Sequence, residues 1–270
     1  MKNQPIGVFD SGLGGLTAVK ELQILMPEEN IIYFGDTGRV PYGTRGRDTI
    51  RKYAAQDMNF LLRHNVKMVI SACGTISSTC ADIGAALPVP FLGIVEPAAE
   101  AAAAATANGR IGVLGTSATV NSRAFEHHLK RLLPNCSVTQ QACPLFVNLV
   151  EGGFVAKTDP VLQLVARRYL EPMMENEVDT LILGCTHFPI IAPVIRSIMG
   201  PGVTLINSGA ESAHRAMQVL EAQGLRTDRK TSGTASYFVT DEVQGFARIG
   251  SQFLGRELTG NVTKIDMDSL

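Results

Sequence analysis

Two apolar runs in this 270-residue chain end alike, each in a cysteine followed by small and hydroxyl-bearing residues. The first run, residues 66–70, reaches Cys73 through a serine and an alanine, and the second, residues 178–183, reaches Cys185 through a glycine. Short apolar runs bounded by turn residues are typical of buried strands. Each thiol is therefore expected at the end of a strand. Cys73 should lie beside a helix N-terminus, where a thiolate is favoured.

A second segment of the sequence, upstream of each cysteine, also occurs twice. Residues 6–12 are echoed by residues 111–117, with an offset of 105 positions between the strands and 112 between the cysteines. An internal duplication of one unit of strands and helices is the simplest explanation. Since the length also suits about two domains, we expect two similar α/β domains.

The chain after the second unit has no counterpart in the first half. Residues 235–240 predict one more strand, and Asp241 is expected to cap a helix behind it. This tail is easiest to place if it returns to the first domain. We therefore expect residues 1–97 and 208–270 to form one discontinuous domain and residues 98–207 to form a second, inserted one.

Several further elements follow from apolar spacing. Residues 98–107 predict an alanine-rich helix that crosses between the domains. Within the second domain, residues 120–133 predict a helix, 137–142 a strand, and 146–153 a short apolar segment. A later helix is expected to bury one face, made of Val161, Val165, Tyr169 and Met173.

Composition and charge exclude several classes of protein. The 24 basic and 25 acidic residues nearly balance, without a basic stripe, so nucleic acid and anionic membranes are not expected as partners. Neither a spanning apolar run nor a signal peptide is recognisable, which predicts a cytoplasmic protein. Five cysteines without a C-x-x-C pair indicate reduced thiols, with no disulfide framework and no metal site.

Two loops follow predicted strands near the start of the chain. Asp10 and Ser11 end the first strand, at the edge where open α/β sheets bind ligands. The glycines that follow lack the G-x-G-x-x-G spacing, so no dinucleotide cofactor is expected and a tight turn remains an alternative. Residues 35–43, with Tyr42, suit a substrate loop, although an ordinary surface loop is nearly as good an interpretation.

The pair of cysteines suggests a chemistry. A single thiol is most often a buried small apolar group, which is the interpretation given to Cys80, Cys136 and Cys143. If the two domains face one another, however, Cys73 and Cys185 lie on opposite sides of one cleft. A thiol on each face suits the inversion of a stereocentre, in which a base removes a proton and an acid returns one.

At this point a family resemblance becomes clear over essentially the whole chain. Its motifs are Gly7–Leu16, Gly35–Asp36, Pro41–Gly43, Ala72–Thr75, Gly115–Thr116, Glu151 and Leu183–Pro189. The sequence resembles the glutamate racemases of the cofactor-independent aspartate/glutamate racemase superfamily. The resemblance implies two flavodoxin-like three-layer domains related by a pseudo-twofold axis, with the active site between them. It also implies interconversion of L- and D-glutamate, which supplies D-glutamate for peptidoglycan.

The same resemblance implies roles for individual residues. Cys73 and Cys185 would be the catalytic bases for D- and L-glutamate respectively, assisted by Asp10 and His187. The substrate's amino and carboxylate groups would be held by Asp10, Ser11, Tyr42, Gly43, Gly74, Thr75, Thr186 and His187, with Glu151 as a further acidic position. For His187, a capping or packing role is the alternative. No cofactor or metal is implied; the partner is a small amino acid, and a homodimer stays open.

Two positions depart from the family pattern. Many members carry asparagine where this chain has Gly74, so only a backbone N–H is expected to bind there. Gly74→Ala is then expected to be tolerated to within a few fold, provided that the local φ is negative. Asn207 stands where aspartate is common and predicts a turn or cap. Two alternative functions remain, namely an aspartate racemase of the same superfamily and a hinged two-domain binding protein without chemistry.

Overall fold

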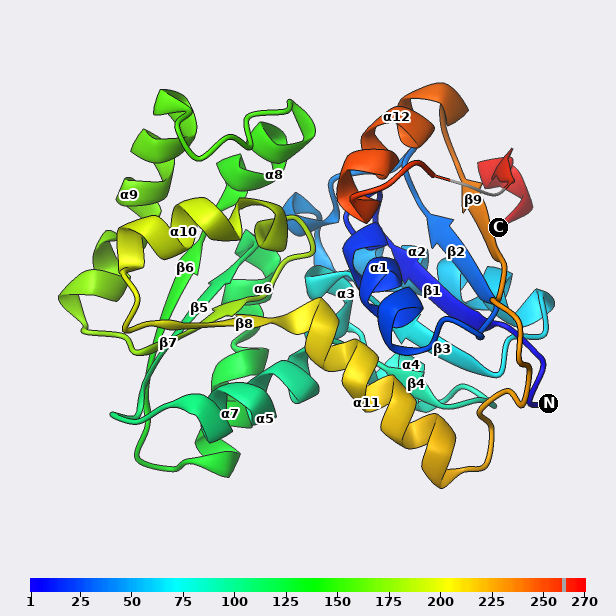
Figure 1. Ribbon diagram of the computed structural model, residues 1–270, viewed down its shortest axis with the longest axis horizontal. Helices are drawn as coiled ribbons and strands as arrows, with labels where there is room; N and C mark the ends of the chain where they lie inside the picture. Colours follow the sequence, from blue (N-terminus) through cyan, green and yellow to red (C-terminus); the bar gives the residue numbers. More distant parts are fainter. Residues whose placement is uncertain (259–260) are drawn as a thin grey trace.

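The computed structural model describes residues 1–258 and 261–270, and two parallel β-sheets dominate it (Figure 1). The larger sheet has the order β10-β9-β2-β1-β3-β4 and the smaller one the order β6-β5-β7-β8. The larger sheet consists of β1 (Ile6–Asp10), β2 (Ile31–Gly35), β3 (Met68–Ser71), β4 (Phe91–Leu92), β9 (Ala235–Val239) and β10 (Val262–Lys264). The smaller consists of β5 (Arg110–Gly115), β6 (Ser137–Ala142), β7 (Thr180–Leu183) and β8 (Thr204–Asn207).

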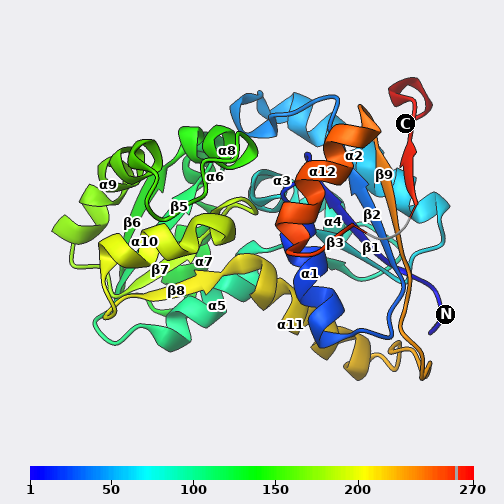
Figure 2. The ribbon, with the colours of Figure 1, turned by 45° about the horizontal axis from the view of Figure 1, so that its top comes forward.

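Helices connect the strands and cover the sheets (Figures 1 and 2). Those of the first half are α1 (Leu16–Leu25), α2 (Arg47–Arg63), α3 (Gly74–Thr79), α4 (Ala81–Ala85) and α5 (Val95–Ala105). They are followed by α6 (Ser117–Ser122), α7 (Ala124–Leu132), α8 (Pro144–Glu151), α9 (Pro160–Glu175), α10 (Ala192–Met199), α11 (Ser208–Ala222) and α12 (Val243–Leu254). Short 3₁₀ turns are η1 (Tyr42–Thr44), η2 (Phe188–Ile191) and η3 (Met267–Ser269).

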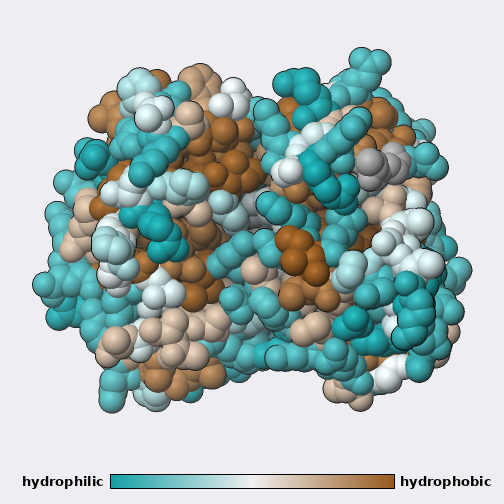
Figure 3. Space-filling model, viewed as in Figure 1, coloured by the Kyte–Doolittle hydropathy of each residue, from teal (hydrophilic) through white to brown (hydrophobic). Residues whose placement is uncertain are grey.

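The two sheets share one strand order. In the first, β1 lies between β2 and β3, and in the second β5 lies between β6 and β7 in the same way. This arrangement is the order of a flavodoxin-like sheet, in which ligands bind beyond the carboxyl ends of the strands. The predicted class, two α/β units with parallel sheets, is confirmed. Figure 3 shows the two lobes with a notch between their upper ends.

The tail of the chain extends the first sheet, because β9 pairs with β2 and β10 pairs with β9. Helix α11 leads back from the second sheet and packs against α1 and α5 (Figure 1). Sheet membership thus supports the domain boundaries expected from the sequence. We propose residues 1–97 with 208–270 as one domain and residues 98–207 as the other.

Capping residues explain where several helices begin. The Asp159 side chain accepts hydrogen bonds at the start of α9, where Pro160 follows, and Asn207 does the same for α11. The predicted cap of α12 is wrong by one residue. Glu242 accepts from the backbone of Gln244 and Gly245, whereas the N–H of Asp241 donates to Thr37 in a loop.

Three other expectations need correction. The single helix expected over 120–133 is two helices, α6 and α7, because Arg123 adopts a left-handed conformation at φ 54°. Residues 146–151 of the apolar segment at 146–153 belong to helix α8, which ends at Glu151. In α9 the buried face is Leu162, Ala166, Leu170 and Met173, and Val161 is 48% exposed. Packing against α10 and β6 selects this stripe, although the apolar residues beside it make the sequence pattern ambiguous.

Candidate active site

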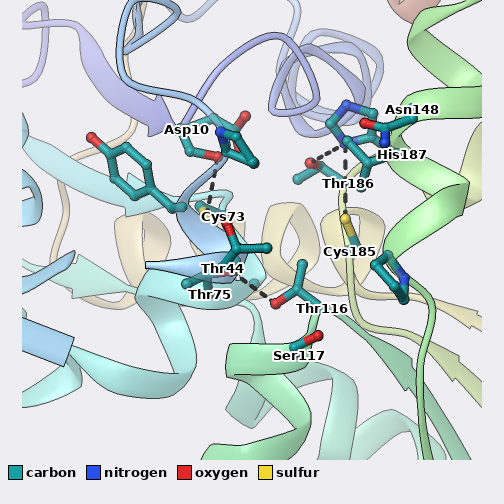
Figure 4. Close-up of a pocket in the computed structure, with 17 residues that line it drawn as sticks. Asp10, Thr44, Cys73, Thr75, Thr116, Ser117, Asn148, Cys185, Thr186 and His187 are labelled. Carbon is teal, nitrogen blue, oxygen red and sulfur yellow. Dashed lines mark hydrogen bonds between the residues drawn. The ribbon is translucent and has the colours of Figure 1, made fainter. Parts of the chain in front are cut away.

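A cavity of about 140 Å³ lies between the two halves, at the carboxyl ends of both sheets (Figure 4). The first half contributes Asp10, Ser11, Pro41, Tyr42, Gly43, Thr44, Cys73, Gly74 and Thr75 to its wall. The second half contributes Thr116, Ser117, Pro144, Val147, Asn148, Cys185, Thr186 and His187. A cavity of this size suits a small molecule, and its wall is rich in hydroxyl groups.

The two cysteines occupy equivalent places in this wall. Cys73 stands two residues beyond the end of β3, and Cys185 two residues beyond the end of β7. Both side chains are buried, with 5% and 6% of their surface exposed, yet both line the cavity. The other three cysteines are also buried, but none of them lines it. The structure therefore brings together the pair that the repeat singled out.

Glycines allow the two halves to approach closely around the cavity. A β-carbon on Gly43 would lie 2.7 Å from Cβ of Thr116, and one on Gly14 would lie 2.7 Å from the His187 ring. Because real β-carbons do not come this near to other atoms, the absence of a side chain is what permits both contacts. The glycine-rich turn after β1 thus has a packing role toward the second half.

The expectation that Gly74→Ala is tolerated is wrong. A β-carbon at this position would lie less than 3.0 Å from the carbonyl oxygen of Gly184, a backbone atom that cannot rotate away. Helix α3 does begin directly after Cys73, so the N–H groups of its first turn are free of helical partners. Gly74 therefore presents its backbone to the cavity while its Cα packs against the second half.

The surroundings of Cys73 favour the protonated thiol. Its sulfur donates a hydrogen bond to the hydroxyl of Ser11 at 3.6 Å. Burial and the nearby carboxylate of Asp10 raise the pKa of Cys73 to about 12. The expectation of a thiolate at this helix start is therefore wrong, because a six-residue helix offsets little of the cost of burying a charge next to a carboxylate.

Cys185 has a different neighbour. Its sulfur lies 3.8 Å from Nδ1 of His187 (Figure 4). On the other side of the ring, Nε2 of His187 lies 2.8 Å from Oε1 of Glu151. Burial alone would lower the pKa of His187, but the hydrogen bonds to Cys185 and Glu151 outweigh it and raise the pKa to about 10. A protonated imidazole beside Cys185 stabilises negative charge on that sulfur. His187 also packs edge-on against Phe253.

One carboxylate oxygen of Asp10 is available to accept a hydrogen bond. The side chain is 1% exposed, and its Oδ2 accepts a hydrogen bond from the N–H of Gly12 at 3.0 Å. Within the described part of the chain, Oδ1 has no hydrogen-bond partner. Burial raises the pKa of Asp10, against the opposing effects of His187 and the Gly12 N–H. Since Asp10 lines the cavity, a bound ammonium group would satisfy this oxygen.

Two residues proposed from the sequence are placed differently from the rest. Tyr42 lines the cavity, but its hydroxyl is hydrogen-bonded to Asp36 and Asp57, neither of which belongs to the cavity wall. Glu151 lies behind His187, outside the cavity wall. The remaining residues named from the sequence, including Ser11, Thr75 and Thr186, all line the cavity.

Sequence reasoning missed part of the wall. Thr116 is the counterpart of Ser11 in the repeat, since the offset of 105 maps position 11 onto 116, so the repeat could have identified it as a wall residue. Pro144, Val147 and Asn148 belong to α8, which follows β6 as the loop with Tyr42 follows β2. Glu151, at the end of the same helix, is named from the sequence, but the apolar and amide residues of the helix carry no signal of their own.

Residues 1–258 and 261–270 contain no group of three or more histidine, cysteine, aspartate or glutamate side chains that could hold a metal ion. They also contain no helix long and apolar enough to cross a membrane.

Comparisons with known proteins agree with this geometry. A family model described as Asp/Glu/Hydantoin racemase matches residues 18–216. The curated glutamate racemase of Geobacter metallireducens is 41% identical over 98% of this chain and 97% of its own length. That of Chlorobaculum tepidum is 43% identical over 95% of this chain and 94% of its own.

A solved structure gives the same result. The glutamate racemase of Francisella tularensis, crystallised in complex with D-glutamate, has a TM-score of 0.92 and 37% sequence identity, and each chain covers 100% of the other. The likeness therefore extends over both halves and the cavity between them. The chain belongs to the Asp/Glu/Hydantoin racemase family and groups within it with the glutamate racemases.

Proposed function

We propose that this protein interconverts L- and D-glutamate without a cofactor, with Cys73 and Cys185 as the two acid–base groups. The observation that carries the proposal is the pair of buried thiols that line one cavity from equivalent strand ends. Relatives that are about 40% identical over nearly the whole chain and are named glutamate racemase support the choice of substrate.

The reaction needs one proton acceptor and one proton donor. A thiolate removes the proton from Cα, and the electron pair of the broken C–H bond remains on the substrate as a carbanion. The opposite thiol then donates its proton to the other face, which forms the new C–H bond and leaves that sulfur as the thiolate. Following the family resemblance, Cys185 is the base for L-glutamate and Cys73 the base for D-glutamate.

The electrostatics of the two thiols suit the L to D direction. Protonated His187 stabilises negative charge on Cys185, so this sulfur can act as the base. Cys73 carries its proton at neutral pH and can act as the donor. In the opposite direction Cys73 must lose its proton first, and an ammonium group bound at Asp10 would neutralise the carboxylate that opposes this loss.

The cavity wall supplies groups for each part of an amino-acid substrate. We assign the ammonium group to Asp10 and one carboxylate to the backbone N–H groups of Gly74 and Thr75 at the start of α3. Hydroxyl groups of Ser11, Thr116 and Thr186 line the same space. Among the described residues of the wall, none is lysine or arginine, so neutral donors and His187 must hold the carboxylates.

The wider role follows from the family resemblance. We propose that the D-glutamate is formed in the cytoplasm and used for peptidoglycan. Light scattering of the purified chain decides between a monomer and the homodimer that the sequence allows.

The test is a racemisation assay on the purified protein after dialysis against a chelator. Circular dichroism should show L-glutamate and D-glutamate each converging on the racemic mixture, with no added metal or pyridoxal phosphate. L-Aspartate, measured in parallel, should remain optically active. Activity that returned only with an added cofactor would overturn the two-thiol mechanism, and turnover of aspartate alone would overturn the choice of substrate.

A further inference from the structure

A buried polar cluster lies behind the part of the cavity wall formed by Tyr42. Its members are Asp36 after β2, Arg39, Asp57 on α2 and Thr240 after β9, all grouped around the hydroxyl of Tyr42. We call these five residues the Tyr42 anchor. Asp36, Asp57 and Tyr42 have at most 1% of their surface exposed, and only Tyr42 lines the cavity.

Hydrogen bonds tie the anchor together. Asp36 Oδ2 accepts from the Tyr42 hydroxyl and from Nε of Arg39, the latter at 2.5 Å, while Oδ1 accepts from Thr240 at 2.8 Å. Asp57 contacts the Tyr42 hydroxyl at 3.1 Å through Oδ2 and Arg39 at 3.2 Å through Oδ1. Each carboxylate oxygen of the anchor therefore has a partner.

The charges of the anchor balance if one carboxyl group is neutral. It holds two carboxyl groups and a single guanidinium. Burial and the neighbouring Asp36 raise the pKa of Asp57 well above its ordinary value. The Tyr42 hydroxyl is within hydrogen-bond distance of Oδ2 of Asp36 and of Oδ2 of Asp57. Tyr42 is then held from two sides in one orientation.

The held ring controls a turn of the cavity wall. Tyr42 begins the turn η1, and Gly43 within it packs against Thr116 of the second half so closely that a β-carbon would lie 2.7 Å from Cβ of Thr116. A displacement of Tyr42 as a whole would shift the adjoining Gly43 backbone, which has little room against Thr116. The Tyr42 hydroxyl itself is bonded to Asp36 and Asp57 within the anchor.

We propose that Asp57 and Asp36 are positioning residues for substrate recognition, which hold the turn at Tyr42–Thr44 against Thr116 through the Tyr42 hydroxyl and thereby set the affinity for the amino acid. This inference rests on the proposed function. A purely structural role would affect stability alone. Positioning residues should instead change Kd and KM for the amino acid while kcat stays nearly the same.

The experiment compares Asp57→Leu with Asp57→Asn. Leucine has a similar size but makes no hydrogen bond, whereas asparagine keeps a donor and an acceptor and resembles protonated aspartate. Titration calorimetry gives Kd for D-glutamate, and steady-state kinetics give KM and kcat. We expect Asp57→Leu to raise Kd and KM by about 5- to 10-fold with kcat changed by less than about threefold. Asp57→Asn should restore both constants to within about threefold of wild type.

A matched control separates stability from positioning. Glu29 is a buried carboxylate of the same half, paired with Lys67 at 2.5 Å and outside the cavity wall. Glu29→Leu should lower the melting temperature at least as much as Asp57→Leu, yet leave KM unchanged. If Asp57→Leu does not fold, Tyr42→Phe removes only the hydroxyl from the anchor and should show the same rise in KM.

The outcomes separate the inference from the function on which it rests. A wild-type protein that racemises glutamate, with variants of Asp57 and Tyr42 that bind it equally well, would overturn the inference and leave the function intact. A fall in kcat at unchanged KM would also overturn it. A wild-type protein that neither binds nor racemises glutamate would overturn the proposed function itself.

Discussion

The carbonyl oxygen of Gly184 lies where a β-carbon on Gly74 would have to stand, less than 3.0 Å from its ideal position. Each glycine is the immediate neighbour of a cavity-lining cysteine, Gly74 of Cys73 and Gly184 of Cys185. The contact therefore joins the two strand ends that carry the thiols. The distance between the two thiols therefore depends on residue 74 having no β-carbon.

Gly74→Ala should consequently impair the enzyme. The new β-carbon must push the Gly184 backbone away and with it Cys185, and we expect kcat/KM for glutamate to fall by about 10-fold or more. Gly46→Ala is the matched control, because a β-carbon there meets nothing within 4 Å and the residue has an ordinary φ of −67°. Equal activity of the Gly74→Ala and Gly46→Ala proteins would show that the Gly184 backbone moves aside without loss of activity.

Loss of either thiol should abolish racemisation in both directions. A positioned acid or base is worth about 10²–10⁴ in rate, so Cys73→Ala and Cys185→Ala should each lower kcat by at least roughly 10³-fold. Cys80→Ala, Cys136→Ala and Cys143→Ala remove thiols outside the cavity wall and should keep near-normal turnover. A Cys73→Ala protein that still racemises glutamate at a comparable rate is incompatible with the mechanism.

Deuterium exchange should distinguish the two inactive variants. With one thiol left, only one enantiomer can present its Cα proton to a base. In deuterated water, any residual exchange without inversion should therefore appear for D-glutamate in Cys185→Ala and for L-glutamate in Cys73→Ala. Nuclear magnetic resonance of the recovered amino acid measures the deuterium at Cα. The reverse pattern would make Cys73 the base for L-glutamate and Cys185 the base for D-glutamate.

Alkylation should report on the raised pKa of the Cys73 thiol. Because burial and Asp10 raise this pKa to about 12, iodoacetamide near pH 7.5 should modify Cys73 slowly. Asp10→Asn removes the negative charge, lowers the pKa of Cys73 and should accelerate its modification several-fold. Peptide mass spectrometry measures both rates. Buried Cys143, whose pKa is also raised, serves as the unreactive reference, and an Asp10→Asn protein with unchanged Cys73 reactivity would contradict the argument.

The pH dependence of stability should report on His187. Its pKa is raised from 6.5 to about 10 in the folded protein, so the stabilisation linked to its proton is fully present below pH 6.5 and lost as the pH rises through 10. Glu151→Gln removes one cause of the raised pKa and should move this loss of unfolding free energy to lower pH. Urea unfolding between pH 6.5 and 10.5 measures it. Glu177→Gln, at an exposed ion pair with Arg110, should leave the profile unchanged, and superimposable curves for wild type and Glu151→Gln would contradict the assignment.

Much of the site could be predicted from short-range patterns. Apolar runs that end in polar residues located the carboxyl ends of β1, β3 and β7, and parallel strands place such ends along one edge of a sheet. The internal repeat also pairs Cys73 with Cys185. The capping role of Asn207 at the start of α11 follows from its residue type in the same way.

The sequence by itself determined the fold class, the family and which thiols share a site, because periodicity, repeat offset and local motifs are properties of neighbouring residues. Only the tertiary structure decided the protonation of Cys73, the direction of the Tyr42 hydroxyl, the contribution of α8 to the wall and the intolerance of Gly74 to a side chain. Each of these depends on burial and on groups distant in the chain, such as Asp10 beside Cys73, Asp57 beside Tyr42 and Gly184 beside Gly74. A one-dimensional pattern carries no record of such distances.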